Sequence, residues 1–386
     1  MNILWYSNSP WSPTGYGAQT KLFAPRIRDL GHDVGIFAFY GIEGGVLHWQ
    51  GMPVFPRAHH PYGVDIVGAH AKQHNADIVI SLIDAWVLRP DMMPGVKWVP
   101  WFPVDAEPAP PPVIDKVAQA YRRIVFSKFG EQMVHDAGLD CYYVPHGVDT
   151  NVYKPVDMAE ARERTGLPKD AFIVGMVAAN KGNPSRKAFH QQIAAFAKFH
   201  RRHTDAVLYI HSCTAQNGEN DGVNLVNLCR GEGLEIGKDV FFPDQYGYTI
   251  GGYSEEAVNL LYNSFNVHML VSMGEGFGVP IIEAQAAGCP VIVGDWTAMG
   301  ELCFSGIKVA KEDADPFYLP LNTFQFAPRI RAIEIALEAE YKHPSSRERA
   351  RREALAYDAD TITAQYWKPV LEDIAQSVEL WKGGKA

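Results

Sequence analysis

Short apolar segments alternate with stretches of helical periodicity along most of this 386-residue chain. In the first part we expect strands at Ile3–Tyr6, Val34–Tyr40, Ile78–Ile83, Lys97–Phe102 and Ile124–Ser127. In the second part we expect them at Phe172–Ala178, Val207–His211, Val240–Phe242, Val267–Val271 and Val291–Val293. Strands that alternate with helices are typical of parallel sheets covered by helices. The pattern therefore predicts an α/β fold with two doubly wound sheets.

Proline and glycine mark the boundary between the two parts. Pro145, Gly147 and Pro155 interrupt the pattern, so we place a linker at Val148–Val156. The predicted organisation is an N-terminal domain, a second domain and a helical closing segment, at residues 1–150, 151–356 and 357–386.

Three other prolines change the predicted elements. Pro100 weakens the case for a strand at residues 97–102, because proline cannot donate to a sheet ladder. Glu107–Pro112 (EPAPPP) predicts an extended loop rather than a helix. The helical pattern of Tyr357–Lys382 contains Pro369, which predicts a break or kink there.

Composition narrows the class of protein. A chain of this length with 47% hydrophobic residues can form two cores. The net charge of −9 gives no general attraction to nucleic acid or anionic membranes, and the basic run Arg347–Arg352 is mixed in sign and predicts a solvated helix face.

Five scattered cysteines without CxxC spacing indicate mostly buried thiols in a reducing compartment. No run reaches the ~18 apolar residues of a membrane span, and the chain begins directly as a strand, so we expect a soluble cytoplasmic protein without a signal peptide.

The segment Glu275–Glu283 (EGFGVPIIE) carries the most chemical information. It follows an apolar strand and leads into a helix, with Pro280 suited to the first helical position and Gly288 to the helix end. Ligands of open α/β sheets bind at the carboxyl ends of strands, and glycine amides at a helix N-terminus attract phosphate. Carboxylates accept hydrogen bonds from hydroxyls. The segment suits a phosphorylated, polyhydroxylated ligand such as a nucleotide-sugar, although spacing alone equally fits two solvated glutamates.

This segment resembles the E-x7-E motif of retaining glycosyltransferases with the GT-B architecture, in particular those of family 4. Other segments resemble the same family in order: FSKFGEQMVHDAGL followed by VPHGVDTNVYKP, FIVGMVAANKGNPSRKAFHQQIAAFAKF, and YSEEAVNLLYNSFNVHMLVS. The resemblance covers most of the second half strongly and the first half loosely. It implies two Rossmann-like domains that face a cleft, with the closing segment returning to the first domain.

The resemblance also implies roles for the motif residues. Glu275 would contact the sugar near the reacting carbon, and Glu283 would hold the ribose hydroxyls. Gly276, Phe277 and Gly278 would present their backbone to sugar and phosphate. The nucleobase would lie against the loop Pro243–Tyr248.

Lys181, Arg186 and Lys187 follow the expected strand at residues 172–178 and are candidates to bind the diphosphate. Fixed cations stabilise the charge that develops on the leaving phosphate. The family's usual arginine after this strand is replaced by Ala178–Asn180; Lys187 matches the family's lysine best, and Lys181 or Arg186 would supply the second cation. The alternative is that these are solvated loop charges.

In the first domain, Gly15 and Gly17 lie in the loop Ser9–Thr20 between the first strand and the first helix. Their amides could contact a diphosphate, or the glycines could simply serve the turn. Asp105 stands where the family often has a histidine and is a candidate to orient or deprotonate an acceptor hydroxyl. Asp84 is a second candidate, and either could instead cap a helix. His146 is interpreted as a turn residue.

The resulting prediction is a retaining hexosyl- or pentosyltransferase. It would use a UDP- or GDP-sugar as co-substrate, with no cofactor and no metal. The D-x-D triplets at Asp313–Asp315 and Asp358–Asp360 are interpreted as loop or cap residues. The acceptor is open: a small molecule, lipid, protein or modified DNA base. The alternatives are a GT-B epimerase or hydrolase, a pyridoxal-phosphate-dependent phosphorylase, and a non-catalytic sugar-nucleotide-binding protein.

Overall fold

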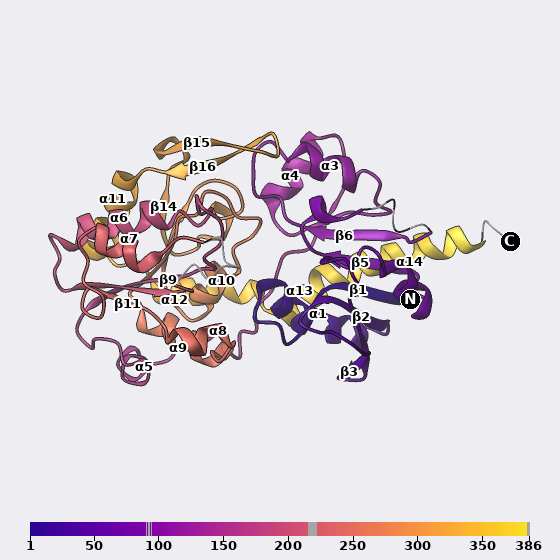
Figure 1. Ribbon diagram of the computed structural model, residues 1–386, viewed down its shortest axis with the longest axis horizontal. Coiled ribbons are helices and arrows are strands. Elements are labelled where there is room, and N and C mark those ends of the chain that lie inside the picture. The colour runs from indigo at the N-terminus through magenta and orange to yellow at the C-terminus, as the bar shows by residue number, and fades with distance from the viewer. Residues whose placement is uncertain (90, 92, 94, 215–221, 384–386) are drawn as a thin grey trace. The chain divides into compact units, whose positions relative to one another are not determined.

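The computed structural model describes residues 1–89, 91, 93, 95–214 and 222–383 (Figure 1). Two compact units make up the chain. Unit 1 contains Met1–Val148, Pro320–Thr323 and Tyr357–Ala386, and unit 2 contains Asp149–Leu319 and Phe324–Ala356. Residues 384–386 of the predicted closing segment lie outside the described residues.

Unit 1 is built on an eight-stranded sheet with the order β3-β4-β2-β1-β5-β6-β7-β8. Every neighbouring pair is parallel except β3 and β4. The chain enters at β1 and then builds the sheet outward on both sides of that strand, which is a doubly wound arrangement. The strands are β1 Asn2–Asn8, β2 Asp33–Tyr40, β3 Leu47–Trp49, β4 Met52–Pro56, β5 Ile78–Leu82, β6 Trp98–Phe102, β7 Ile124–Val125 and β8 Tyr142–Tyr143.

The closing segment belongs to unit 1, and Figure 1 shows its helices α13 and α14 in yellow. Its Trp367 is fully buried, with ring centroids 5.7 Å from Trp5 and 4.9 Å from Trp101. A π-helical turn at Thr363–Trp367 separates α13 (Ala359–Ile362) from α14 (Lys368–Gly383). The break predicted at Pro369 is thus present, immediately before the proline.

The other helices of unit 1 are α1 Gly15–Asp29, α2 Val67–Gln73, α3 Pro111–Val117 and α4 Lys128–Asp136, with a 3₁₀ turn at Ala85–Val87. The strand expected at residues 97–102 is confirmed as β6. Pro100 lies inside β6 opposite Ser81, and it is tolerated because the short β7 pairs only with Trp101 and Phe102. The extended loop expected at Glu107–Pro112 is wrong at its end, where Pro111 begins α3, because the first helical turn requires no amide donor.

Unit 2 contains a six-stranded, fully parallel sheet with the order β11-β10-β9-β12-β13-β14. The chain again builds outward from its first strand, so the strand order reverses between β9 and β12. In such sheets this reversal point is where ligands bind. The strands are β9 Phe172–Val177, β10 Ala206–His211, β11 Val240–Phe241, β12 Val267–Leu270, β13 Val291–Gly294 and β14 Gly306–Val309.

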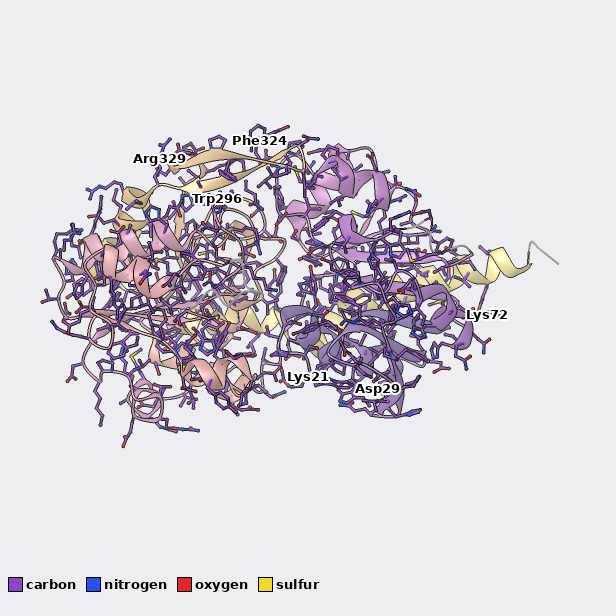
Figure 2. The ribbon with its side chains drawn as sticks, in the orientation of Figure 1. Lys21, Asp29, Lys72, Trp296, Phe324 and Arg329 are labelled. Carbon is purple, nitrogen blue, oxygen red and sulfur yellow. The ribbon has the colours of Figure 1, made fainter. Side chains whose placement is uncertain are left out.

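Eight helices and a hairpin complete the part of unit 2 that the structure describes. The hairpin joins β15 (Ala314–Leu319) to β16 (Thr323–Pro328), and Arg329 at its end pairs with Asp315 at 2.7 Å (Figure 2). The helices are α5 Met158–Thr165, α6 Phe189–His200, α7 Leu225–Gly231, α8 Gln245–Thr249, α9 Glu255–Ser264, α10 Val279–Ala286, α11 Ile330–Lys342 and α12 Arg347–Ala354.

The predicted linker at residues 148–156 is held to unit 2 over most of its length. The backbone amides of Lys154 and Val156 donate to Asn259 and Asn263 of α9, at 3.0 and 2.7 Å. Arg351 of α12 donates to the carbonyls of Thr150 and Tyr153. Residues 149–156 of the predicted linker therefore belong structurally to unit 2.

One polar prediction holds in part and another is wrong. The basic run does form an exposed helix face at residues 348, 349, 352 and 353, but Arg347 and Arg351 are partly buried and donate to main-chain carbonyls of Phe265, Ala286 and the linker. His146 is a buried ring stacked 4.1 Å from Phe126, and burial lowers its pKa to about 3.

The five cysteines are free, and two of them, Cys229 and Cys289, are fully buried. The other three are partly buried, so the prediction of mostly buried thiols overstated their burial. No helix in the described ranges is long and apolar enough to cross a membrane.

Candidate active site

The candidate site of unit 2 lies at the reversal point of its sheet. Strands β9 and β12 are parallel neighbours, with Val174 opposite Val267 and Gly175 opposite His268. The loops that follow them therefore leave the same edge side by side. One loop carries Arg186 and Lys187, and the other carries Glu275.

These two loops meet through a buried ion pair. The Nζ of Lys187 lies 2.5 Å from Oε1 of Glu275, and Nη1 of Arg186 lies 2.9 Å from Oε2. The Glu275 side chain is only 6% exposed and that of Lys187 13%, whereas that of Arg186 is 39% exposed. Of the two cations, Arg186 is therefore the more accessible to a ligand.

The charge of Glu275 is set by its partners. Burial alone would raise the pKa of this carboxyl group, but Arg186 and Lys187 outweigh burial and lower the pKa to about 2. Glu275 is thus ionised throughout the physiological range, and the three side chains together carry a net positive charge.

Main-chain hydrogen bonds hold the Glu275 loop in place. The Glu275 amide donates to Thr297 Oγ1 at 3.1 Å, and Arg186 donates to the Gly274 carbonyl. The indole of Trp296, labelled in Figure 2, donates to the carbonyls of Ser272 and Met273 at 3.0 and 3.1 Å. A loop tied at so many points can present a charged group with little freedom to move.

The turn after Glu275 is buried, and its backbone conformation favours glycine at residue 278. Gly278 has a φ of +105°, a backbone conformation that strains any residue with a Cβ, and a Cβ there would also lie 2.8 Å from the end of the Ile281 side chain. Gly276 is buried as well, and Phe277 is 3% exposed, so Phe277 can offer a ligand little beyond its backbone. Pro280 lies in the first turn of α10, as predicted.

Glu283 lies in α10 in a very different environment. Its carboxyl group accepts a hydrogen bond from Tyr262 Oη at 2.8 Å and another from Tyr153. Burial raises its pKa to about 7 despite these two donors. Neither tyrosine was identified from the sequence, because both lie outside the motif, in other segments of the chain.

The remaining candidates of unit 2 separate into different roles. Lys181 is exposed and has no ion pair among the described residues, so Arg186 rather than Lys181 accompanies Lys187. Asn180, which replaces the family's arginine, is buried and joins the Cys213 and Val223 carbonyls. The prediction that Pro243–Tyr248 forms a loop is wrong. Helix α8 begins at Gln245, and Asp244 is its N-cap.

Gly15 and Gly17 in unit 1 also differ. The Gly17 amide donates to Thr14 Oγ1 at 3.0 Å, and a Cβ on Gly17 would lie 2.4 Å from the Ser12 carbonyl. Close packing therefore already requires this glycine. Gly15 has open space around its Cα and is the freer of the two to approach an anion.

The acidic candidates of unit 1 follow adjacent strands. Asp84 follows β5, next to β1 at the reversal point, and accepts a hydrogen bond from Tyr16 Oη at 3.2 Å. Asp105 follows β6, one strand further along, and is partly buried. Asp84 begins the 3₁₀ turn Ala85–Val87 without a side-chain capping bond.

The D-x-D triplets have structural partners. Asp358 caps α13 and Asp360 pairs with Arg26 at 2.7 Å. Asp315 lies within strand β15 rather than in a loop. Within the part of the chain that is described, no group of three or more His, Cys, Asp or Glu residues has an arrangement suited to a metal ion.

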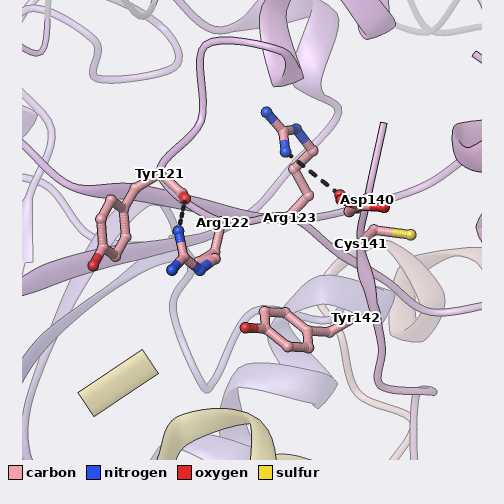
Figure 3. A pocket seen from close by; sticks show the side chains of 6 residues that line it. All are labelled: Tyr121, Arg122, Arg123, Asp140, Cys141 and Tyr142. Carbon is pink, nitrogen blue, oxygen red and sulfur yellow. Dashed lines mark hydrogen bonds between the residues drawn. The ribbon is translucent and has the colours of Figure 1, made fainter. Parts of the chain in front are cut away.

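A separate cavity of about 320 Å³ lies in unit 1 where β7 and β8 begin (Figure 3). This is the edge of the sheet opposite to the edge that Asp84 and Asp105 follow. Its arginines are occupied by the protein itself. Arg123 donates to the carbonyls of Val117 and Ala118, and Arg122 to the Tyr121 carbonyl and Ser377. We therefore interpret this cavity as a structural feature of unit 1 rather than a binding site.

Comparison with known proteins agrees with the geometry of unit 2. Residues 157–303 match the family described as Glycosyl transferases group 1. The D-inositol 3-phosphate glycosyltransferase of Saccharomonospora viridis is 28% identical over 227 residues, 56% of this chain and 50% of that protein. The mannosylfructose-phosphate synthase of Agrobacterium fabrum is 27% identical over 194 residues, 48% of this chain and 39% of that protein. These matches span about half or less of the curated relatives.

Solved structures match over nearly the whole chain. Sucrose-phosphate synthase from Thermosynechococcus elongatus has a TM-score of 0.71 at 16% identity and full coverage of both chains. Anabaena HepE in complex with UDP and glucose has a TM-score of 0.69 at 19% identity, covering 97% of this chain and 99% of that one. The chain therefore has the α/β fold of these solved structures, and its residues 157–303 are similar to the Glycosyl transferases group 1 family.

Proposed function

We propose that this protein is a retaining glycosyltransferase that moves a sugar from a nucleotide-sugar to a hydroxyl acceptor. The observation that carries the proposal is the Glu275 carboxylate held between Lys187 and Arg186 at the reversal point of a Rossmann-like sheet. Structures similar to this chain have been determined with UDP and with UDP-glucose, which supports a UDP-sugar as the first donor to test.

In this proposal the donor diphosphate binds to Arg186 and Lys187. When the bond between the anomeric carbon and the β-phosphate oxygen breaks, that oxygen gains negative charge, which the two cations stabilise. Arg186 is suited to a bidentate grip on phosphate and is exposed enough to move from Glu275 to a ligand. Lys187 keeps Glu275 ionised beside the sugar, where positive charge develops on the reacting carbon.

The acceptor oxygen then bonds to the anomeric carbon, and its proton passes to a base. Asp105 is the candidate favoured by the sequence, and Asp84 is favoured by its position at the reversal point of unit 1. Glu283 would accept hydrogen bonds from the ribose hydroxyls. Gly15, Gly276 and Gly278 would contact phosphate or sugar through their backbone.

The first experiment is a thermal-shift screen of UDP-, GDP-, ADP- and dTDP-sugars. A donor at about a hundredfold its Kd stabilises a protein by ~2.7 kcal/mol, which is readily measured. The selected donor is then incubated with and without acceptors, and the anomeric configuration of the product is determined by NMR. Transfer with inversion, or no transfer with any acceptor, would contradict the proposal.

The same incubations separate the alternatives. An epimerase or hydrolase would convert the donor without an acceptor, and a non-catalytic binding protein would be stabilised but would leave the donor intact. A phosphorylase would require pyridoxal phosphate, whose absorbance would be visible in the purified protein.

A further inference from the structure

Four aromatic side chains are exposed along one edge of unit 1. Trp11, Tyr40, Tyr62 and Trp86 are between 37% and 53% exposed, although aromatic residues usually bury most of their surface. Below they are called the aromatic rim. Each follows a different strand, so the grouping is not visible as a cluster in the sequence.

The sheet order places these four residues side by side. Tyr62 follows β4, Tyr40 ends β2, Trp11 follows β1, and Trp86 follows β5. These four strands are consecutive neighbours in the sheet and all run parallel, so their carboxyl ends share one edge. Neighbouring strands lie about 4.8 Å apart, so the rim extends over roughly 14 Å. That length suits a short chain of rings better than a single small molecule.

Hydrogen bonds hold one side chain of the rim and the backbone at the other three positions. The Trp11 indole donates to the Gly41 carbonyl at 2.6 Å, and the Tyr40 carbonyl accepts from the Ser9 amide at 2.9 Å. The Tyr62 carbonyl accepts from the hydroxyl of Tyr6, and Lys116 donates to the Trp86 carbonyl. A side chain that is already held, as that of Trp11 is, loses little conformational entropy when a ligand packs on it.

Two polar side chains belong to the loops and helix that carry Trp11 and Trp86. Tyr16, in the first turn of α1, donates to Asp84, which precedes Trp86 by two residues. A carboxylate and a phenol are partners for hydroxyl groups. Aromatic faces flanking hydroxyl-binding groups are suited to sugar rings, whose C–H faces are apolar and whose edges carry hydroxyls.

The charge of the rim argues against an anionic ligand. The rim loops, residues 9–16, 40–47, 57–63 and 83–88, contain the charged residues Glu43, Arg57 and Asp84, a net charge of −1 with neutral histidines, and Lys116, which donates to the Trp86 carbonyl, brings the total to zero. Glu43 and Arg57 pair with each other at 2.7 Å. Nucleic-acid sites combine stacking residues with a positively charged groove, and these loops do not supply one.

We propose that the aromatic rim binds a neutral saccharide and that this saccharide is the acceptor of the proposed glycosyl transfer. The acceptor part of this inference rests on the proposed function; the binding part does not. Its chemistry is stacking of sugar rings on Trp11 and Trp86, with hydroxyls bonded to Asp84 and Tyr16.

The test is ¹⁹F NMR of full-length protein labelled with 5-fluorotryptophan. The Trp11 and Trp86 signals are assigned from the spectra of Trp11→Phe and Trp86→Phe. The probes are methyl glycosides and linear oligosaccharides of glucose, mannose and N-acetylglucosamine, with single-stranded oligothymidylate as the competing class. We expect at least one saccharide to shift both signals and oligothymidylate to shift neither.

Variants give the matched comparison. Trp86→Ala and Tyr40→Ala should weaken binding of the selected saccharide about tenfold or more, as loss of a stacking side chain does. Tyr318→Ala removes a tyrosine that is 59% exposed on hairpin β15–β16 and should leave binding unchanged. A shift by oligothymidylate alone, by no probe, or equal weakening by Tyr318→Ala would overturn the proposal.

The thermal-shift screen separates this proposal from the proposed function. If a nucleotide-sugar is bound and consumed while the rim variants bind and use saccharides normally, the rim proposal fails and the function stands. If saccharides bind the rim but no nucleotide-sugar is bound, the function fails, and with it the acceptor role.

Discussion

Glu275 and Glu283 are the same residue type in one short segment, yet their surroundings give them opposite properties. Glu275 contacts Lys187 and Arg186, and its pKa is lowered to about 2. Glu283 contacts the hydroxyls of Tyr262 and Tyr153, and burial raises its pKa to about 7. Two buried carboxyl groups can thus differ by several units in pKa because one has cationic partners and the other has only neutral donors.

This difference assigns different roles to the two residues. Glu275 is a permanent charge whose loss would remove the carboxylate that pairs with two cations. Glu283 changes its protonation near neutral pH, so its ability to accept hydrogen bonds from a ligand depends on pH. The experiments below challenge this contrast, in order of expected effect.

The largest effect is expected from Glu275→Ala. Removing one partner of a buried ion pair leaves the other charges uncompensated, which typically costs about 3–5 kcal/mol. We expect a loss in the lower part of that range, because Arg186 is partly exposed. The measurement is urea denaturation at pH 7, with turnover of the selected donor measured in parallel. The extra stability should fade in wild type as pH falls from 4.5 towards 2, since a carboxyl group with a lowered pKa stabilises only while ionised.

A double-mutant cycle provides the control for Glu275. In the Lys187→Met background, Glu275→Gln should lower the free energy of unfolding much less than in wild type, because the ammonium group that pairs with Glu275 is absent. If Glu275→Gln lowers the free energy of unfolding equally in both backgrounds, Glu275 and Lys187 are not energetically coupled. The contrast between Glu275 and Glu283 would then lose its basis.

The second effect concerns the cations. Lys187→Ala should lower turnover by about a hundredfold or more, because a fixed charge at the leaving phosphate is lost. Lys181→Ala, an exposed lysine six residues earlier in the same loop, is the matched control and should stay within about twofold. Similar losses in both variants would mean that general loop charge, rather than the ion-paired geometry, serves the reaction.

The sequence predicted the fold well because the fold depends on repeated patterns. The α/β class is confirmed, and the ten expected strands are present with ends shifted by one or two residues. The strands that were missed are short or at an edge: β3, β4, β8, β14 and the hairpin β15–β16. In β4 (MPVFP) two prolines hide the strand from a sequence pattern, although β4 lies inside the sheet and pairs with both β2 and β3.

The candidate site was predictable where chemistry is local and unpredictable where it depends on distant residues. The position of Glu275 after a strand and of Glu283 within a helix follows from the motif itself. The tyrosines around Glu283 and the Thr297 hydroxyl on the Glu275 amide come from other elements. The role of His146 was misjudged for the same reason, because the rings that bury it are far away in the sequence.

A third, smaller effect should appear in the pH dependence of donor binding. Ribose hydroxyls need an ionised acceptor, so affinity for the selected nucleotide-sugar should rise about tenfold as pH increases from 6 to 8, through the pKa of Glu283. Glu283→Gln should bind more weakly and show no such rise. In the free protein, Glu283→Gln should also raise the unfolding temperature more at pH 8 than at pH 5, because a raised carboxyl pKa destabilises the folded state once the group ionises. If the affinity of the wild-type protein does not change with pH, Glu283, like Glu275, does not change its protonation in this range.

The smallest effect is expected from removing metal. Arg186 and Lys187 place two positive charges beside the strand edge where the diphosphate is proposed to bind, and both D-x-D triplets are engaged in a cap, a strand and ion pairs. Protein cations that neutralise a leaving diphosphate make a divalent ion unnecessary for that step. Turnover after EDTA treatment and gel filtration should therefore remain within about twofold of the untreated enzyme. A loss restored by Mg²⁺ or Mn²⁺, and abolished by Asp313→Asn or Asp358→Asn, would show that charge at the diphosphate comes from a metal and not from the cations that hold Glu275.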